Sequence, residues 1–318
     1  MYIGKEAFIK APDRQSAKAL FAKSVSRVEV ETHSCCNRRC DYCPNSTGDR
    51  LGTNRRLPEE LWSLLLSNLQ EVDFAGNFVF SGYNEPLADR LILERVREAR
   101  SHVPRARLMI YTNGDYLSPA YLEELSAAGL DYLHISIHVL PGEKYDDLNS
   151  INSMVDVARR LEKPIRFIKM SLQEYLIATV PSQVTEIEIR SINYWNQGTD
   201  RGGLLSGFTM PARRSLPCHF PFAHVNVGYD GTVVPCCHIK SDAEMHGPYR
   251  YGNLRDYGSI FELYGAEAAV AWRRHLISPD DKQGPCSNCS VSFLNNDQGA
   301  MNLARMAWEK HVKAHVGR

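Results

Sequence analysis

Short apolar and β-branched runs alternate along residues 28–192 with longer stretches whose apolar residues recur at helical spacing. The short runs predict strands at residues 27–32, 77–81, 107–112, 132–137, 165–172 and 185–189. The longer stretches predict helices at residues 58–71, 87–102, 119–128 and 143–161, and a short helix at 173–182. Such alternation is typical of a parallel sheet with right-handed crossovers. Six units are too few to close an eight-stranded barrel, so we expect an open sheet or a partial barrel.

The pattern changes after residue 192. Residues 193–206 contain Gly198, Gly202 and Gly203, which is typical of a linker. Two apolar runs at 223–227 and 232–234 flank Asp230-Gly231 and predict a β-hairpin, and residues 300–316 predict a helix. We therefore expect an N-terminal extension at residues 1–26, an α/β domain at 27–200, a smaller domain at 201–299 and a C-terminal helix at 300–318.

Composition narrows the class of protein. The 318 residues include 37 basic and 37 acidic side chains, so no basic excess is available to neutralise the phosphates of a nucleic acid. No apolar run approaches the roughly 18–20 residues of a membrane span. Charged residues leave no secretory signal within the first thirty positions: Lys5, Lys10, Asp13, Arg14, Lys18 and Lys23. We expect a cytoplasmic protein without nucleic-acid or membrane partners.

The nine cysteines fall into two groups. Cys35, Cys36, Cys40 and Cys43 lie within one nine-residue stretch. The other five lie in the last third of the chain: Cys218, Cys236, Cys237, Cys286 and Cys289. Cytosolic thiols stay reduced, so disulfides are not expected. Two thiolate sites that bind a soft metal explain this grouping better than cysteines scattered through a core.

The first group follows the first predicted strand and has the spacing Cys36-x₃-Cys40-x₂-Cys43. Three thiolates can hold three irons of a 4Fe–4S cluster and leave the fourth iron open, at the edge of a β/α sheet where such folds do their chemistry. Zinc is the alternative, with His33 or Cys35 as a fourth ligand.

The second group offers four thiolates, from Cys218, Cys236, Cys286 and Cys289. Full ligation suits electron transfer or a structural role rather than chemistry at an open metal position. Two separated cysteine pairs are equally typical of a Cys₄ zinc site, so the spacing alone leaves both metals open.

The chain resembles the radical S-adenosylmethionine (SAM) enzymes, through Cys36, Cys40 and Cys43 with the aromatic Tyr42 before the last cysteine. Ser81-Gly82-Tyr83-Asn84-Glu85-Pro86 is similar to the family's glycine-glycine-glutamate-proline motif, although two residues separate Gly82 from Glu85. The resemblance implies that the three cysteines form the catalytic cluster site. It also implies that Tyr42, Gly82, Glu85, Asn113 and Ser136 bind SAM, with Glu85 facing the ammonium group and Ser136 the ribose.

The C-terminal cysteines resemble those of the SPASM extension. Pro217-Cys218, Gly231-x₄-Cys236, Gly252-Asn253 and Cys286-x₂-Cys289 occur in the family's order. No cysteine follows Cys289, so the resemblance implies the shortened "twitch" form with one auxiliary cluster. The Gly-x₄-Cys spacing selects Cys236 rather than Cys237 as a ligand. The implied fold is α/β, a partial (β/α)6 TIM-like barrel followed by a small cysteine-rich twitch-type domain made of a β-hairpin and a helix.

The resemblance also implies cofactors and a reaction. Two 4Fe–4S clusters and SAM would generate a 5′-deoxyadenosyl radical, and a flavodoxin or ferredoxin would supply the electron. Family members with one auxiliary cluster include dehydrogenases of amino sugars or cyclitols, in which that cluster accepts the substrate's second electron. We therefore expect oxidation of a small polar metabolite. Four residues are candidates to contact it: Tyr83, His138, Lys169 and Arg190.

Three alternatives remain at this point. One is a peptide-modifying enzyme; these often carry a leader-recognition domain of some eighty residues, for which about 27 residues before the first strand leave no space. Another is a redox-neutral epimerase, dehydratase or decarboxylase. The third, from a different class, is a non-catalytic metal-binding scaffold.

Overall fold

The computed structural model describes residues 2–46, 48, 50, 54–208, 213–291 and 298–313. The chain forms two compact units. The first, called here the barrel unit, consists of Val30–Arg56 and Asn77–Gly198. The second, called the cysteine-rich unit, consists of Met1–Glu29, Leu57–Gly76 and Thr199–Arg318. Strand β1 (Arg27–Val30) lies where the chain passes from the second unit to the first.

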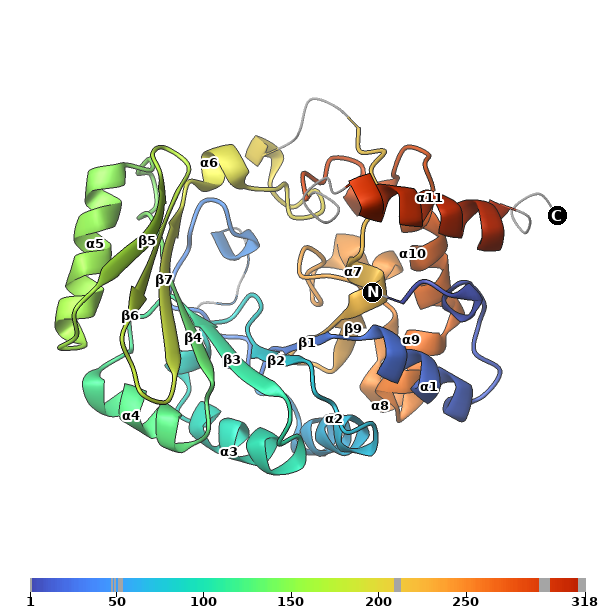
Figure 1. Ribbon diagram of the computed structural model, residues 1–318, viewed down its shortest axis with the longest axis horizontal. Helices are drawn as coiled ribbons and strands as arrows, with labels where there is room; N and C mark the ends of the chain where they lie inside the picture. The colour runs from blue at the N-terminus through green and yellow to red at the C-terminus, as the bar shows by residue number, and fades with distance from the viewer. Residues whose placement is uncertain are drawn as a thin grey trace. The chain divides into compact units, whose positions relative to one another are not determined.

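The barrel unit contains a sheet with the strand order β2-β3-β4-β7-β6-β5 (Figure 1). Its strands are β2 (Asn77–Phe80), β3 (Arg107–Thr112), β4 (Tyr132–Ile137), β5 (Arg166–Ser171), β6 (Tyr175–Val180) and β7 (Glu186–Ile192). β2, β3, β4 and β7 pair in parallel, whereas β6 pairs antiparallel with both β5 and β7. The sheet is open, with β5 at one edge. The predicted class, α/β with an open, parallel-rich sheet, is confirmed.

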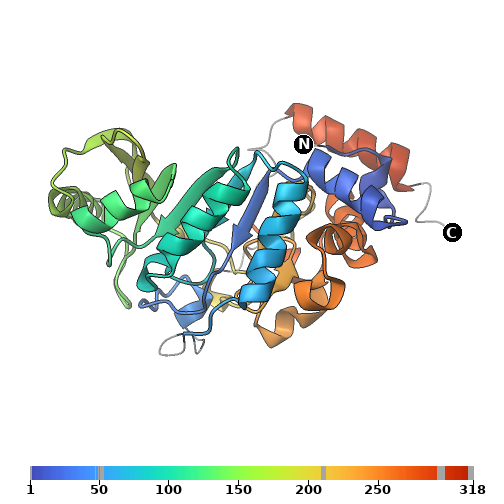
Figure 2. The ribbon, with the colours of Figure 1, turned by 90° about the horizontal axis from the view of Figure 1, so that it is seen from below.

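Three helices lie on the outer side of this sheet (Figures 1 and 2). They are α3 (Ile92–His102), α4 (Pro119–Ala127) and α5 (Asp147–Arg160), and shorter elements are η2 (Pro44–Ser46), η3 (Pro86–Ala88) and α6 (Tyr194–Gln197). Ser118 and Asp146 cap α4 and α5 by accepting hydrogen bonds from the first-turn N–H groups. Ser191 of β7 donates to Ser150 of α5 at 2.9 Å, which identifies the strand face that the helix covers.

The helix predicted at residues 173–182 is wrong. This segment is strand β6, joined to β5 by a turn in which Gln173 has a φ of 62°. Its residues include Tyr175, Ile177, Thr179 and Val180, which favour a pleated conformation. Burial alternates along it, with Leu176, Ala178 and Val180 buried, so the period is two rather than 3.6. The last part of the sheet is therefore an antiparallel meander, and the fifth predicted strand is followed by a strand instead of the helix of a fifth β/α unit.

The cysteine-rich unit is built mainly from short helices around a small hairpin. Its helices are η1 (Lys5–Phe8), α1 (Arg14–Ser24), α2 (Glu59–Glu71), η4 (Ser206–Phe208), α7 (Phe220–Ala223), η5 (Glu244–Tyr249), α8 (Leu254–Tyr257), α9 (Ile260–Gly265), α10 (Glu267–Ile277), η6 (Gly284–Cys286) and α11 (Gln298–His311). Its strands are β8 (His224–Val227), β9 (Thr232–Val234) and β10 (Gly252–Asn253). Part of the predicted C-terminal helix, residues 314–318, lies outside the described residues.

The predicted hairpin is confirmed. β8 and β9 pair antiparallel across the Asp230-Gly231 turn, in which Gly231 has a φ of 82° that favours glycine. The hydrogen bond from the Gly228 N–H to the Thr232 carbonyl, at 2.8 Å, closes the turn. Within the described part of the chain, no helix is both long and apolar enough to cross a membrane.

Candidate functional site

The first three candidate cysteines lie in the loop after β1, called here the cysteine loop (residues 31–56). The Cys43 N–H donates to the Cys40 carbonyl at 2.9 Å, and the Ser46 N–H donates to the Cys43 carbonyl at 2.9 Å, so Cys40 and Cys43 are held in one tight turn. Burial, together with negative charge on the neighbouring cysteines, raises the pKa of Cys36 to about 12 and that of Cys40 to about 11. Buried thiols grouped in this way need a cation to hold their thiolate form, which fits a thiolate-bound cluster.

Side chains tie this loop to the end of β3. The Arg38 guanidinium donates to both carboxylate oxygens of Asp115, at 2.7 and 2.6 Å. Asn37 donates to Asp115 at 2.7 Å and accepts a hydrogen bond from the Asn113 amide at 2.8 Å. Asn113 therefore orients the loop with its side chain. Its expected contact with SAM remains a prediction.

Tyr42 ties the loop to the end of β4. Its hydroxyl lies 3.0 Å from Nδ1 of His138 and accepts a hydrogen bond from the Val139 N–H at 3.2 Å. Its ring stacks on Tyr194, with centroids 4.4 Å apart. His138, predicted as a substrate contact, is thus bound to the cysteine loop. It also lines a cavity of about 340 Å³ together with Asn113, Ser153, Asp156 and Arg160. Such a volume is typical of a small-molecule site.

The loop of residues 81–86 packs on a buried ion pair. Gly82 has a φ of 145°, and a Cβ there would lie 2.4 Å from Cγ of Glu31. Glu31 accepts a hydrogen bond from the Tyr83 N–H at 2.5 Å and pairs with Arg50 at 2.6 Å. The Arg50 guanidinium lies 5.7 Å from the centre of the Tyr83 ring. Gly82 is therefore required by packing, and Tyr83, 7% exposed, is part of the same packing.

Glu85 links three segments of the barrel unit. Its N–H donates to the Cys35 carbonyl at 2.8 Å. Its carboxylate accepts hydrogen bonds from the Leu87 N–H at 3.0 Å, the Thr112 hydroxyl at 2.5 Å and the Asn113 N–H at 2.7 Å. Burial nevertheless raises its pKa to about 7, because these donors offset only part of the lost hydration. A ligand cation beside it would restore the charged form.

Asn84 is a residue that sequence reasoning missed. It is buried, yet neither its Nδ2 nor its Oδ1 has a hydrogen-bond partner within the described residues. Buried amides are normally satisfied, so this pair of atoms fits contact with a polar ligand that the protein alone does not supply. The sequence did contain a signal for Asn84, since it is one of the two residues that separate Gly82 from Glu85 in the motif. Asn84, with Glu85, fits the amino-acid end of SAM.

The remaining candidates lie on the inner face of the sheet, opposite α5. Ser136 of β4 pairs in register with Arg190 of β7, which pairs with Ile177 of β6, and Ile177 pairs with Lys169 of β5. Arg190 contacts Glu188 through its Nε. Lys169 is exposed at the edge strand, with its Nζ 4.9 Å from the centre of the Tyr175 ring. The structure thus places Ser136 and Arg190 side by side, whereas Lys169 lies two strands away from Arg190.

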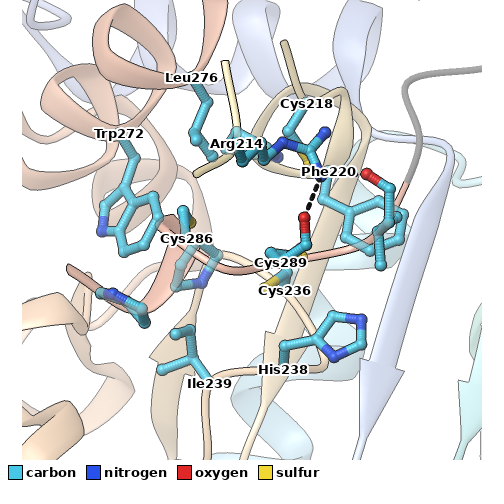
Figure 3. Close-up of a pocket in the computed structure, with 14 residues that line it drawn as sticks. Arg214, Cys218, Phe220, Cys236, His238, Ile239, Trp272, Leu276, Cys286 and Cys289 are labelled. Atoms are coloured by element: carbon cyan, nitrogen blue, oxygen red, sulfur yellow. Dashed lines mark hydrogen bonds between the residues drawn. The ribbon is translucent and has the colours of Figure 1, made fainter. Parts of the chain in front are cut away.

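The second cysteine set gathers around one cavity of the cysteine-rich unit. Cys218, Cys236, Cys286 and Cys289 all line it, and the other walls are mostly apolar, including Phe220, Trp272 and Leu276 (Figure 3). Cys237 is not among the described residues that line this cavity. Burial raises the pKa of Cys218 to about 11 and that of Cys286 further, with added repulsion from neighbouring cysteines. Four thiols around an apolar cavity, those of Cys218 and Cys286 buried, fit a fully ligated cluster.

Two buried cations accompany these cysteines, and sequence reasoning missed both. Arg214 is 7% exposed, and its guanidinium donates to four carbonyls: Leu216, Pro217, Cys289 and Val291. Lys282 is fully buried and donates to the carbonyls of Ser278 and Asp280 at 2.5 and 2.8 Å. The Lys282 N–H donates to the Arg214 carbonyl at 2.7 Å, so the two cations are adjacent. Both favour the thiolate forms of Cys218 and Cys286.

Among the residues that the structure describes, no three His, Cys, Asp or Glu side chains are arranged as ligands of a single metal ion.

Comparison with protein families identifies the regions that carry the two cysteine sets. The model of the radical SAM superfamily matches residues 30–175, and that of the SPASM iron–sulfur cluster-binding domain matches residues 218–290. The chain belongs to the radical SAM superfamily. It is an enzyme of this superfamily with a C-terminal SPASM domain, and its cofactors are SAM and 4Fe–4S clusters.

Two relatives and one solved structure illustrate the similarity. The chain is 28% identical over 278 residues to the S-adenosyl-L-methionine-dependent 2-deoxy-scyllo-inosamine dehydrogenase of Niallia circulans, which covers 87% of this chain and 97% of that protein. It is 26% identical to a probable GTP 3′,8-cyclase of Thermococcus kodakarensis over only 46% of each chain. A crystal structure of BtrN in complex with AdoMet and 2-DOIA has a TM-score of 0.60 and 24% identity, covering 86% of this chain and 96% of that one. The structural match supports the fold.

We expect Glu85→Gln to weaken SAM binding by about 10- to 100-fold, the range for loss of a charge-assisted hydrogen bond. Anaerobic calorimetry on the reconstituted protein without reductant measures the affinity, and visible absorption checks that both clusters remain. Glu94→Gln, an exposed change on α3 of the same unit, is the control and should leave SAM affinity unaltered. An unchanged affinity in Glu85→Gln would show that another residue faces the ammonium group.

We expect Lys282→Met to lower the reduction potential of the auxiliary cluster, because a buried positive charge favours the more negative, reduced state. A redox titration followed by electron paramagnetic resonance measures this shift. Lys310→Met, on the exposed side of α11, is the control and should leave the potential as in the wild type. A Lys282→Met cluster with an unaltered or higher potential would contradict the electrostatic role.

Proposed function

We propose that this enzyme dehydrogenates a hydroxyl group of an aminocyclitol or a closely similar amino sugar. The observation that carries the proposal is the end-to-end similarity to the 2-deoxy-scyllo-inosamine dehydrogenase, which extends over 97% of that protein. The similarity to the GTP 3′,8-cyclase covers less than half of either chain, so it supports the radical SAM chemistry but not a shared substrate. The four cysteines around one cavity add a site suited to electron transfer.

In this proposal, Cys36, Cys40 and Cys43 hold the catalytic cluster, and Cys218, Cys236, Cys286 and Cys289 hold the auxiliary cluster. Asn84 and Glu85 bind the amino-acid end of SAM. When bound, the first cluster and SAM would supply radical chemistry for abstracting a hydrogen atom from the substrate, and the second cluster would supply an acceptor for the remaining electron. The net change converts a secondary alcohol to a ketone and releases one proton to solvent.

The protein's own contribution is orientation and exclusion of water. Asn37 and Arg38 hold the cysteine loop against Asp115, and Tyr42 holds it against His138, so the ends of two strands fix the position of the loop. Phe220, Trp272 and Leu276 keep the auxiliary site apolar. Arg214 and Lys282 add positive charge there, which makes the site a better electron acceptor. A flavodoxin or ferredoxin is the proposed source of the electron for the first cluster.

We expect Cys286→Ala to separate SAM cleavage from substrate oxidation. Loss of one of four thiolates should remove the auxiliary cluster, while the first cysteine site lies in the other unit and stays intact. With dithionite, SAM and 2-deoxy-scyllo-inosamine, the wild type should form 5′-deoxyadenosine and ketone in equal amounts. The variant should form 5′-deoxyadenosine without ketone, as measured by mass spectrometry.

A substrate deuterated at the oxidised carbon provides the internal check. Deuterium should enter 5′-deoxyadenosine in both proteins, since hydrogen abstraction precedes loss of the second electron. Ketone formation at the wild-type rate by a Cys286→Ala protein that lacks the auxiliary cluster would refute the electron-acceptor role. It would favour a redox-neutral radical reaction instead.

A further inference from the structure

A group of polar side chains on the inner face of the barrel unit lies outside the two cysteine sites described above, and Ser136 is the one member expected to contact SAM. Alternation along a strand places Tyr132, His134 and Ser136 of β4 on one face. The parallel register sets His134 beside Glu188 and Ser136 beside Arg190. Ser191 of β7 faces α5, so Glu188 and Arg190 face the opposite, inner side. These residues form a polar patch one to two layers below the edge where Tyr42 meets His138.

Glu188 is the centre of this patch. The Tyr132 hydroxyl donates to its Oε1 at 2.7 Å, the Arg190 Nε donates to the same oxygen, and Nδ1 of His134 lies 3.5 Å from it. Burial alone would raise the pKa of Glu188, but these three groups outweigh it and hold the pKa at about 2. All of these contacts fall on Oε1. Oε2 accepts no hydrogen bond within the described part of the chain.

The Arg190 guanidinium provides hydrogen-bond donors beside the Glu188 carboxylate. Its Nε is used by Glu188, whereas its two terminal amino groups make no hydrogen bond to the described residues. The Arg190 side chain is 38% exposed and that of Glu188 is 13% exposed. The pair therefore presents a fixed carboxylate oxygen and a fixed guanidinium edge to the space above the inner face. A carboxylate oxygen accepts from an ammonium group, and a guanidinium donates to a hydroxyl oxygen.

We propose that Glu188 and Arg190 form a substrate subsite that binds the ammonium group and a neighbouring hydroxyl of an amino-substituted polyol ring. Oε2 of Glu188 accepts from the ammonium, and a terminal amino group of Arg190 donates to the hydroxyl. Tyr132 and His134 are positioning residues that fix the carboxylate. Arg190 lies in the same layer as Ser136 and Glu188 lies one layer deeper, about 7 Å along the strands. The subsite thus holds one side of the ring and leaves the other side toward the edge of the sheet.

This inference rests on the proposed function, since it assigns the amine of that substrate class to named atoms. It is tested by binding, without turnover, to the anaerobically reconstituted full chain loaded with SAM and without reductant. The probes are two amines, 2-deoxy-scyllo-inosamine and glucosamine, each with the neutral counterpart in which a hydroxyl replaces the amine. Calorimetry gives the preference of each protein for the amine over its counterpart.

Glu188→Gln should weaken binding of the preferred amine by about 10- to 100-fold and leave binding of the neutral counterpart within about threefold. SAM affinity should not change. Glu186→Gln is the matched control: it makes the same change on the same strand and face, at an exposed residue that pairs with Arg107. It should keep the wild-type preference. A merely structural role for Glu188 would weaken both probes equally.

Arg190→Gln is a second test variant, in which the preference for the amine should change in the opposite direction. The Arg190 side chain is partly exposed, so the substitution is less of a risk to folding. It should weaken the neutral counterpart several-fold yet raise the preference for the amine, because Glu188 then carries an unopposed negative charge. An unchanged amine preference in both variants, with a wild type that binds and oxidises the amine, overturns the subsite alone. A wild type that binds neither amine, whatever the variants do, overturns the subsite and the aminocyclitol proposal together.

Discussion

The buried carboxylate of Glu85 is the interaction on which the barrel-unit site depends. A carboxylate without water must have its oxygens engaged by donors, and here these come from the start of η3 and from the end of β3. The backbone of the same residue donates to Cys35, next to the first candidate ligand. In the described part of the cysteine loop, regular structure is limited to η2 and a single bridge between His33 and Arg56. The loop is therefore positioned by the ends of two strands rather than by its own backbone.

The ion pair of Glu31 with Arg50 also fixes the loop that carries Glu85, because Glu31 accepts a hydrogen bond from the Tyr83 N–H. Both side chains are almost completely buried, so neither could lose its partner without leaving an isolated charge in the interior. Gly82 fits against Glu31 only because it has no Cβ. This packing explains how the loop tolerates two residues between Gly82 and Glu85. Tyr83 lies against Arg50, and Asn84 is left with the two unpartnered polar atoms that fit a ligand.

Much of the fold followed from patterns with a direct physical cause. The strands that end at Thr112 and Ile137, the capped helices α4 and α5 and the Asp230-Gly231 hairpin each combine a periodic apolar pattern with a turn or cap signal. The grouping of cysteines likewise predicted the four that line one cavity of the cysteine-rich unit. The prediction failed at residues 173–182 because the segment is short. Its β-branched residues and its apolar residues at a period of two favour a strand over the predicted helix.

The roles of Arg214 and Glu188 could not be predicted because each depends on distant partners. Arg214 donates to carbonyls around residue 290, and Glu188 meets Tyr132 and His134 across 56 and 54 positions of sequence. The error at β6 has a consequence for the site. In the expected repeat, the strand with Lys169 would follow β4 directly in the sheet. The antiparallel meander instead places β7 next to β4, so Glu188 and Arg190, rather than Lys169, face His134 and Ser136. The departure from a regular barrel thereby determines which charged residues lie below the edge where Tyr42 meets His138.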